Sequence, residues 1–224
     1  MPIRRARTPG AWALVAVSVV ALALAGCGGR KPLPPLSAIV DAPFLRPGSS
    51  WSYKVVDSSL PQPTTLTLTF DREDAYKGKG VLSFSAGPET ILYDRDLNFV
   101  AVANGGRVLR EASPSLRSFD FPFYVGKQWR AVFTFQDYVR TLSWTPVEMF
   151  WTVKEYDAVK VPAGEFRAFL LVSEASTNWG VRREEIWYAP EVRQIVKLKR
   201  ERTAAHYLGK GQESWELIQY SLKP

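Results

Sequence analysis

The chain has 224 residues and a formal net charge of +7, with 46% hydrophobic and 13% aromatic residues, a composition that suits one globular domain with its own core. A single cysteine and a single histidine exclude an intrachain disulfide and a zinc site built from His and Cys clusters. Three of the arginines lie in the first ten residues, and without them 26 Lys and Arg face 22 Asp and Glu, a net charge of +4.

Residues 1–26 predict a signal peptide. The first ten residues carry three arginines and no acid, and the sixteen residues from Ala11 to Gly26 carry no charge. A basic region followed by a short apolar region is typical of a secretory signal, and the run is shorter than the ~20 apolar residues of a membrane span. Arg4 and Arg5 lack the apolar residues that follow the pair in a twin-arginine signal, so we expect export by the general route.

The apolar run ends in Leu24-Ala25-Gly26-Cys27, which resembles the lipobox of bacterial lipoproteins. The resemblance implies cleavage between Gly26 and Cys27, a diacylglycerol on the Cys27 thiol and an acyl chain on the new amino group. We expect no other cofactor. The alternatives are a secreted protein with an incidental cysteine and an uncleaved anchor.

Residues 27–49 predict a tether between the lipidated cysteine and the folded domain. Five prolines in this segment disfavour a helix or an inner strand and favour an extended chain of up to ~60 Å. Part of the tether can pack back on the domain through four apolar side chains, Ile39, Val40, Phe44 and Leu45.

The expected location is the cell envelope, with the membrane contacted through the lipid anchor. The residue after the cysteine is Gly28 rather than Asp, which under the enteric sorting rule directs a lipoprotein to the outer membrane, facing the periplasm. There, the +4 charge of the mature chain suits contact with anionic headgroups or polymers, although solubility is the simpler explanation. We do not expect binding to nucleic acid.

Residues 50–224 predict a single β domain. Apolar residues alternate from Trp51 onward in runs of strand length, and no segment after residue 50 shows a 3.6-residue period. The clearest hairpin signal is Asn104-Gly105, because a type I′ turn needs two positive φ angles. After the signal helix and the Pro-rich tether, we therefore expect a mainly β fold: a single antiparallel, strongly curved sheet or open half-barrel of about ten strands.

Three motifs occur in order along this domain: FPFYVGKQW at Phe121–Trp129, VKVPAGEFRAFLL at Val159–Leu171, and IWYAPEVRQIVKLKRE at Ile186–Glu201, followed by the terminal ELIQYSL. Their order and spacing resemble a group of uncharacterised exported bacterial β-sheet proteins and lipoproteins, over most of the stretch from Phe44 to Leu222. The resemblance implies a curved antiparallel sheet and supplies no catalytic residues.

Two turns within these motifs carry specific expectations. We expect Pro162-Ala163-Gly164 to connect two long strands, with Pro162 fixing φ and Gly164 taking a positive φ. Arg193 stands where the group often has glycine, which sets the turn after Pro190 apart.

The residues that could carry chemistry form no convincing site. His206 lies beside a turn signal, and no Gly-x-Ser-x-Gly elbow is present, so we expect a surface histidine rather than a catalytic one. Asp94–Asn98 begins like a calcium loop, but Phe99 and Gly105 occupy the positions that need Gly and Glu. That segment predicts a polar turn.

Three neighbouring carboxylates, Asp71, Glu73 and Asp74, could hold a cation or act as an acid and base. Acidic residues are also common in the turns at strand ends, and we favour this second interpretation. No metal site and no catalytic residue are therefore expected.

Aromatic and charged residues suggest two surfaces. Most of the seven tryptophans after the signal occupy alternating strand positions and are expected in the core, but Trp179 lies in a turn and is the candidate for partner contact. The basic run Lys197–Arg202 is expected to pair with Arg182–Glu185 across a ladder as a solvated face. Contact with anionic headgroups is the alternative.

These features favour a non-enzymatic envelope lipoprotein whose β domain binds an apolar ligand on a concave sheet, or an envelope protein partner. The first alternative is a structural or assembly subunit that makes contact through Trp179 and the sheet edges. The second is a hydrolase that uses Asp71, Glu73 or Asp74. A concave face filled by its own side chains would count against the apolar ligand.

Overall fold

The computed structural model describes residues 39–177, 180–206 and 208–224, which belong to one unit, Pro34–Pro224. The expected signal peptide, the cleavage site at Gly26 and Cys27, most of the tether and Trp179 lie outside the described residues. Within the described ranges, no helix is both long enough and apolar enough to cross a membrane.

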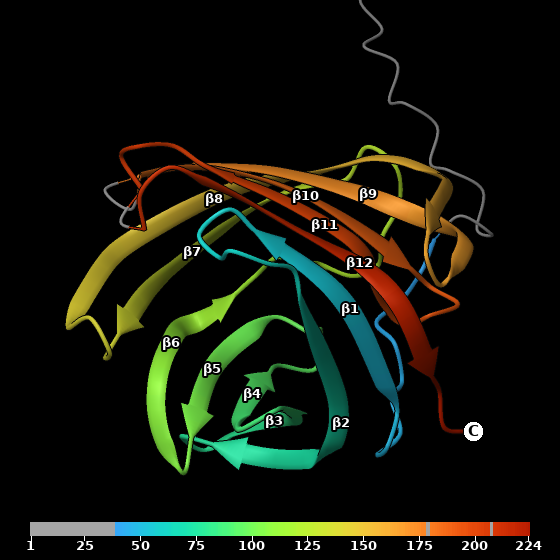
Figure 1. Ribbon diagram of the computed structural model, residues 1–224, viewed down its shortest axis with the longest axis horizontal. Helices are drawn as coiled ribbons and strands as arrows, with labels where there is room; N and C mark the ends of the chain where they lie inside the picture. Colours follow the sequence, from blue (N-terminus) through green and yellow to red (C-terminus); the bar gives the residue numbers. More distant parts are fainter. Residues whose placement is uncertain (1–38, 178–179, 207) are drawn as a thin grey trace, which may run out of the picture. The chain divides into compact units, whose positions relative to one another are not determined.

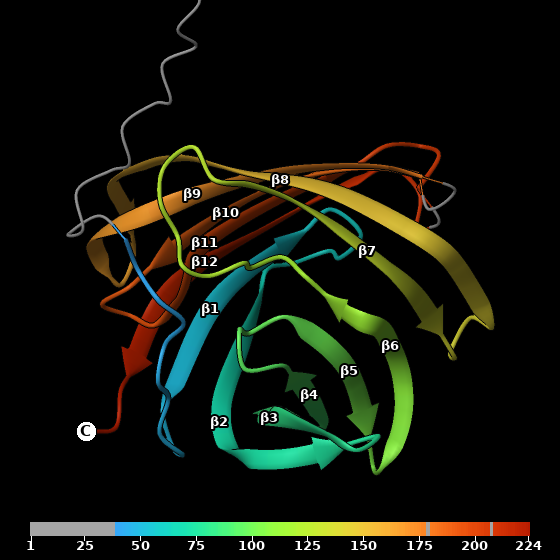
Figure 2. The same ribbon diagram turned by 180° about the vertical axis from the view of Figure 1, so that it is seen from behind.

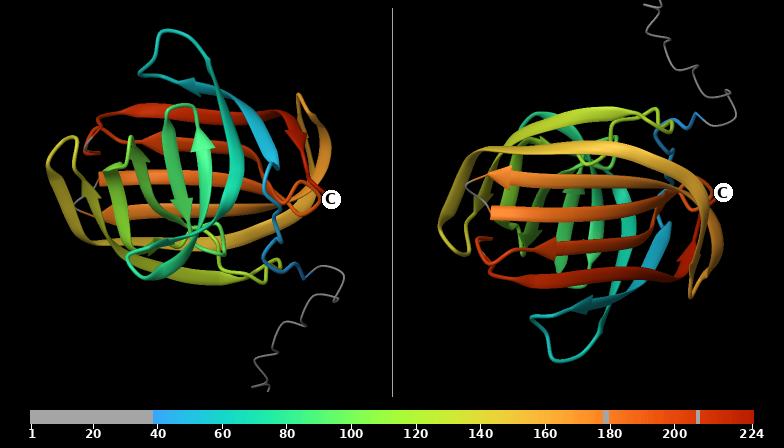
Figure 3. Two further views of the ribbon diagram at one scale, coloured as in Figure 1. Left: turned by 90° about the horizontal axis from the view of Figure 1, so that it is seen from below. Right: turned by 90° about the horizontal axis from the view of Figure 1, so that it is seen from above.

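Twelve strands follow one another along the described chain, and each is antiparallel to the next. They are β1 (Ser50–Asp57), β2 (Thr64–Tyr76), β3 (Lys79–Ala86), β4 (Glu89–Tyr93), β5 (Phe99–Asn104), β6 (Arg107–Leu116), β7 (Gln128–Asp137), β8 (Leu142–Val161), β9 (Gly164–Thr177), β10 (Gly180–Ala189), β11 (Gln194–Arg202) and β12 (Gly211–Ser221). In Figures 1 and 2, β7–β12 form one broad, curved side, and β2–β6 curl beneath it. Figure 3 shows β8–β12 running side by side across the broad side.

The sheet closes into a barrel because β1 pairs with the last strand, β12, as well as with β2. Eight residue pairs join β1 to β12, from Ser50 and Ser221 to Asp57 and Glu213. Closure leaves neither strand with a row of unpaired backbone groups. The mainly β, antiparallel fold is confirmed; the barrel is closed and has twelve strands, where the sequence predicted an open sheet of about ten.

The sequence predicted too few strands for a local reason, and it missed the closure of the barrel for a long-range reason. β4 has only five residues, all half-buried, and β3 has four consecutive buried residues, Val81–Phe84, so neither shows the alternation that marks a half-buried strand. The pairing of β1 with β12 joins opposite ends of the domain, and no local pattern reports it. Register shifts such as those at Phe70/Arg72 and Val153/Glu155 are bulges that bend the strands toward closure.

The barrel interior is occupied by the chain's own side chains. In β8, Val147, Met149, Trp151 and Val153 are at most 1% exposed, whereas Phe150 between them is 59% exposed, as period-two alternation requires. The expectation that tryptophans fill the core is confirmed for Trp51, Trp129, Trp144 and Trp151. Other large side chains that are fully buried are Tyr53, Phe70, Phe84, Phe123, Phe133, Phe169, Leu171 and Tyr188.

Two hairpin turns match the predicted chemistry. The β5–β6 turn uses Gly105 and Gly106, with φ angles of 57° and 80°, while Asn104 pairs with Arg107. It therefore needs two positive φ angles, as expected, but lies one residue later than predicted. Gly164 has a φ of 143° and pairs with Val161 across the β8–β9 turn, which confirms its predicted positive φ.

The turn after Pro190 keeps a glycine-like backbone although it contains arginine. Arg193 has a φ of 58°, in the left-handed region that glycine adopts without cost. Its Nη1 donates a hydrogen bond to the Phe44 carbonyl at 3.0 Å. The side chain thus holds the end of the tether, where Val40 also bridges to Phe123 and Leu45 is buried.

Candidate functional site

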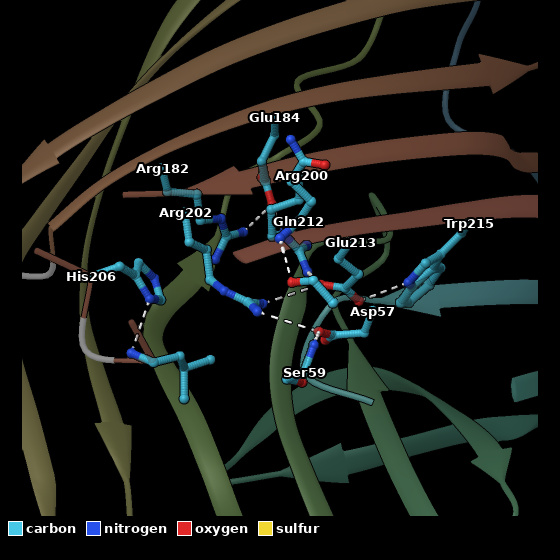
Figure 4. Close-up of polar contacts among 12 residues, drawn as sticks. Asp57, Ser59, Arg182, Glu184, Arg200, Arg202, His206, Gln212, Glu213 and Trp215 are labelled. Atoms are coloured by element: carbon cyan, nitrogen blue, oxygen red, sulfur yellow. Dashed lines mark hydrogen bonds and ion pairs between the residues drawn. The ribbon is translucent and has the colours of Figure 1, made fainter. Parts of the chain in front are cut away.

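Six charged side chains from four strands gather inside one end of the barrel (Figure 4). We call them the inner ion cluster: Asp57 of β1, Arg182 and Glu184 of β10, Arg200 and Arg202 of β11, and Glu213 of β12. Three cations face three anions, so the cluster is electrically neutral when all six groups are ionised.

Strand alternation and register bring these side chains together. Residues two apart on a strand project from the same face, so Arg182 and Glu184 share a face of β10, and Arg200 and Arg202 share one of β11. Glu184 lies opposite Arg200, and Arg182 opposite Arg202. Arg200 also lies opposite Glu213. This shared face is the interior, since the Glu184 side chain is only 1% exposed.

Arg200 is the centre of the cluster. Its Nε donates to Glu184, and its Nη1 donates to Glu213 Oε2 at 2.6 Å. Arg182 donates to the same Glu184 oxygen, so two guanidinium groups share one carboxylate. The other Glu213 oxygen accepts a hydrogen bond from Trp215 Nε1 at 2.7 Å.

Arg202 is held more loosely than Arg200. Its Nη2 lies 3.4 Å from Asp57 Oδ1 and its Nη1 lies 3.9 Å from Glu213 Oε2, both longer than the ~2.7–2.9 Å of a charge-assisted hydrogen bond. Its side chain is only 6% exposed, and its Nε has no hydrogen-bond partner among the described residues. Asp57 Oδ1 is meanwhile bonded by the Ser59 backbone N–H at 2.8 Å and the Ser59 hydroxyl at 2.7 Å.

The cluster sets the ionisation of its members. Burial opposes ionisation of Glu184, but Arg182 and Arg200 outweigh it and lower the pKa of Glu184. Burial and the neighbouring Arg200 lower the pKa of Arg182 to about 10. Both groups are therefore charged at neutral pH.

His206 lies against this cluster. Burial, followed by the charges of Arg182, Arg202 and Arg200, lowers the pKa of His206 to about 4, so it is neutral at neutral pH. Its Nδ1 accepts a hydrogen bond from the Leu208 backbone N–H at 3.2 Å. The predicted surface location is wrong, since His206 is 4% exposed; a turn bonded from His206 N–H to the Thr203 carbonyl folds the ring inward.

A groove of about 710 Å³ opens beside the inner ion cluster. It lies where the β1–β2 and β11–β12 connections meet, joined by a hydrogen bond from the Ser58 N–H to the Gln212 carbonyl at 2.9 Å. The groove is lined by Ser58, Arg183, Glu201, Arg202, Thr203, Ala204, Lys210, Gly211 and Gln212. A second, smaller groove of about 260 Å³ lies around Phe150 on β8. Both grooves open to the surface.

The predicted acidic cluster is not a shared site. Asp71, Glu73 and Asp74 lie within β2, not in a turn at a strand end, so that expectation is wrong. Each carboxylate has a separate partner: Asp71 accepts from Ser85, Glu73 pairs with Arg95 and Asp74 pairs with Arg72. Across residues 39–177, 180–206 and 208–224, no group of three His, Cys, Asp or Glu side chains could hold a metal ion.

The segment Asp94–Asn98 is a polar turn, as predicted. Asp94 Oδ1 accepts hydrogen bonds from the backbone N–H groups of Asp96 at 3.0 Å and Asn98 at 2.9 Å, and Oδ2 accepts one from the Ser115 hydroxyl at 2.6 Å. The carboxylate thus closes its own turn and joins it to β6.

The sequence predicted that β10 pairs with β11, but it did not predict that one side of this ladder faces the barrel interior. Glu184 and Glu185 face Arg200 and Lys199 across the ladder, as expected. The expected solvated face is only half right, because Glu185 and Lys199 point outward while Glu184 and Arg200 point inward. A signal was present, since charged residues at every position of a strand must place half of them on the inner face.

Comparisons with known proteins give fold-level similarity only. No family model matches the chain, and no curated protein matches it. Among solved structures, a predicted exported protein with a YmcC-like fold from Bacteroides fragilis is 14% identical, with a TM-score of 0.45, over 82% of this chain and 99% of that chain. A predicted lipoprotein from Parabacteroides distasonis is 11% identical, with a TM-score of 0.37, over 81% and 99%.

The hypothetical lipoprotein YmcC from Escherichia coli is 8% identical, with a TM-score of 0.42, over 78% of this chain and 86% of that chain. All three have TM-scores below 0.5 and identities of 14% or less, so they transfer no site, partner or role to this chain.

Proposed function

We propose that the protein is a lipid-anchored, non-enzymatic protein of the bacterial cell envelope, attached through Cys27 to the outer membrane and facing the periplasm. Its barrel binds an envelope partner at the end that carries the inner ion cluster. The anchor rests on the sequence Leu24-Ala25-Gly26-Cys27, and the binding surface rests on the structure of the barrel.

The observation that carries the binding surface is the contrast between the occupied interior and the open groove. An apolar ligand would need space on the inner face, where Trp51, Tyr53, Trp151 and Phe169 are at most 1% exposed. The groove of about 710 Å³ is open, and seven of its nine lining residues are polar or charged, although most of the surface that they present to it is apolar. This contrast favours recognition of a polar partner at the rim over storage of an apolar ligand inside the barrel.

A structural or assembly subunit is the second candidate. The β7–β8 hairpin carries three exposed apolar side chains, with Val139 61%, Tyr138 43% and Leu142 38% exposed. Apolar residues gathered on a hairpin tip are typical of protein contacts. A hydrolase receives no such support, because Asp71, Glu73 and Asp74 each bond to a separate polar side chain.

Site-specific photocrosslinking in intact cells tests the proposal. A photoreactive residue is placed at Lys210 in the groove, at Val139 on the β7–β8 hairpin, or at Lys54, an exposed residue of β1 that serves as the control. We expect a reproducible crosslinked product from Lys210 and none from Lys54. A product from Val139 alone would favour the assembly subunit, and equal labelling at all three positions would contradict a defined binding surface.

A further inference from the structure

We propose that the groove beside the inner ion cluster binds a phosphate group, with Arg202 as the principal cation. The inference rests on the proposed function, since it assigns a ligand chemistry to the groove in which we place the partner. It stands on the charge of the groove, on the bonding of Arg202 and on the absence of a side chain at Gly211.

The groove carries a surplus of positive charge. Arg183, Arg202 and Lys210 line it, against the single carboxylate of Glu201. Arg183 has only a long, exposed ion pair with Glu174 at 3.4 Å, and Lys210 is exposed. Cations converging on one concavity raise the local concentration of anions.

Arg202 has bonding capacity that its neighbours do not use. Its guanidinium contacts Asp57 and Glu213 at 3.4 and 3.9 Å, while Arg200 bonds to Glu213 at 2.6 Å. Both arginines contact the Glu213 carboxylate, and Arg200 makes the shorter of the two contacts. A buried guanidinium with two long ion pairs and an Nε that lacks a partner among the described residues is an unusual arrangement, because buried polar groups are normally hydrogen-bonded. Arg202 lines the adjacent groove, so an anion there would give the N–H groups of its guanidinium a further acceptor.

The Arg202 guanidinium occupies space that a side chain at residue 211 would fill. A Cβ at residue 211 would lie 2.5 Å from Arg202 Nη2 and 3.0 Å from Ser58 Oγ. The missing side chain therefore allows Arg202 and the Ser58 hydroxyl to lie close together. Ser58 Oγ already accepts a hydrogen bond from the Gln212 N–H at 2.9 Å, so its own proton is available to donate to a ligand.

These groups match an oxygen anion better than a cation or an apolar ligand. A guanidinium presents N–H groups in a planar fork that fits two oxygens of a carboxylate or phosphate. Arg202 is already balanced within the neutral inner ion cluster, so the charge of a bound anion is met by Arg183 and Lys210, which face the single carboxylate of Glu201 in the groove. A phospholipid headgroup and a soluble phosphate share this chemistry.

Nuclear magnetic resonance of the full chain in detergent tests the proposal. Two probes separate the two sources: inorganic phosphate, and short-chain dihexanoyl phosphatidylglycerol below its micelle concentration, with dihexanoyl phosphatidylcholine as the lipid control. We expect saturable shifts of the Arg202 Nε–H and Gly211 N–H signals with at least one anionic probe. Phosphate alone would indicate a soluble ligand, and phosphatidylglycerol alone would indicate a headgroup.

Charge variants give the second readout. Arg202→Gln is expected to weaken binding by about tenfold or more, and Lys210→Gln by about threefold, in line with the strength of charged hydrogen bonds. Lys54→Gln removes the same charge from the outer face of β1 and is expected to change nothing. Lys210 is exposed, so its variant remains informative if Arg202→Gln fails to fold.

Absence of a saturable shift with both anionic probes would overturn the proposal, as would undiminished binding by folded Arg202→Gln. If Arg202→Gln does not fold, equal binding by the Lys210→Gln and Lys54→Gln variants would overturn it. A crosslink from Lys210 in intact cells could still be observed in that case. It would support a binding partner at the groove whose recognition does not depend on a phosphate group. The proposed function and its ligand chemistry therefore fail separately.

Discussion

Glu184 of β10 and Arg200 of β11 lie opposite each other in the register of the two strands and form an ion pair inside the barrel. Because the Glu184 carboxylate is shared with Arg182, its loss would leave two guanidinium groups without their common anion. We expect Glu184→Gln to lower the free energy of unfolding by about 3–5 kcal/mol, the usual cost of removing one partner of a buried ion pair.

Urea unfolding measures this effect, with Glu185→Gln as the matched control. Glu185 is the next residue on the same strand but points outward, opposite Lys199, and an outer pair contributes only about 0–1 kcal/mol. Equal losses of unfolding free energy in the two variants would show that the buried ion pairs of Glu184 stabilise the protein no more than an outer pair does.

Two neighbouring residues of β8 test whether the interior depends on its own side chains. Trp151 is 1% exposed and stacks on Trp129 with ring centroids 6.0 Å apart, whereas Phe150 is 59% exposed. We expect Trp151→Ala to cost about 3–5 kcal/mol of unfolding free energy, and Phe150→Ala to stay within about 0.5 kcal/mol. Thermal and urea unfolding would detect the difference, and a comparable loss from Phe150→Ala would contradict the assignment of the two faces.

The ionisation of His206 predicts a pH dependence of stability. Its pKa is lowered to about 4, below the ~6.5 of an unfolded histidine, so between these values the unfolded chain binds a proton that the folded chain does not. Stability is therefore complete above about pH 6.5 and falls as the pH drops toward 4. The expected loss between pH 7.5 and 5.0 is at most about 2 kcal/mol.

His206→Gln provides the comparison for that loss. The variant cannot take up the proton, so its free energy of unfolding is expected to change less than that of the parent protein between the same two pH values. Parallel changes in the two proteins would assign the pH dependence to other groups.

Arg193 predicts a local effect on the tether. Arg193→Gly relieves the positive φ of 58°, which costs an L-residue about 1–2 kcal/mol, but removes the hydrogen bond to the Phe44 carbonyl. We expect barrel stability to change by less than about 1 kcal/mol, with faster amide exchange in residues 39–49. Arg193→Lys keeps the backbone strain and loses the guanidinium, so unchanged exchange in both variants would show that the contact with Phe44 has no role.

The strand pattern and the pairing of Glu184 and Glu185 with the basic run Lys197–Arg202 follow from the sequence, because alternation and the pairing of neighbouring strands are local properties. The closure of β1 on β12 does not follow, because it joins the two ends of the domain. Strand alternation implies that half of the charges on β10 and β11 point inward, but it does not say which half, because the charges themselves do not mark the buried face. His206 shows the same limit: its turn was predicted, but the burial of its ring depends on the packing of the whole barrel.

We propose a lipid-anchored barrel whose interior is filled by its own side chains. The most direct test is native mass spectrometry of the full-length gene product, made in a bacterium that processes lipoproteins and released from detergent. We predict a chain that begins at Cys27, carries a diacylglycerol and an N-acyl group, and retains no uncharged apolar molecule. An unacylated chain that begins at Met1, or a mature chain that holds one uncharged apolar ligand per barrel, would contradict the account.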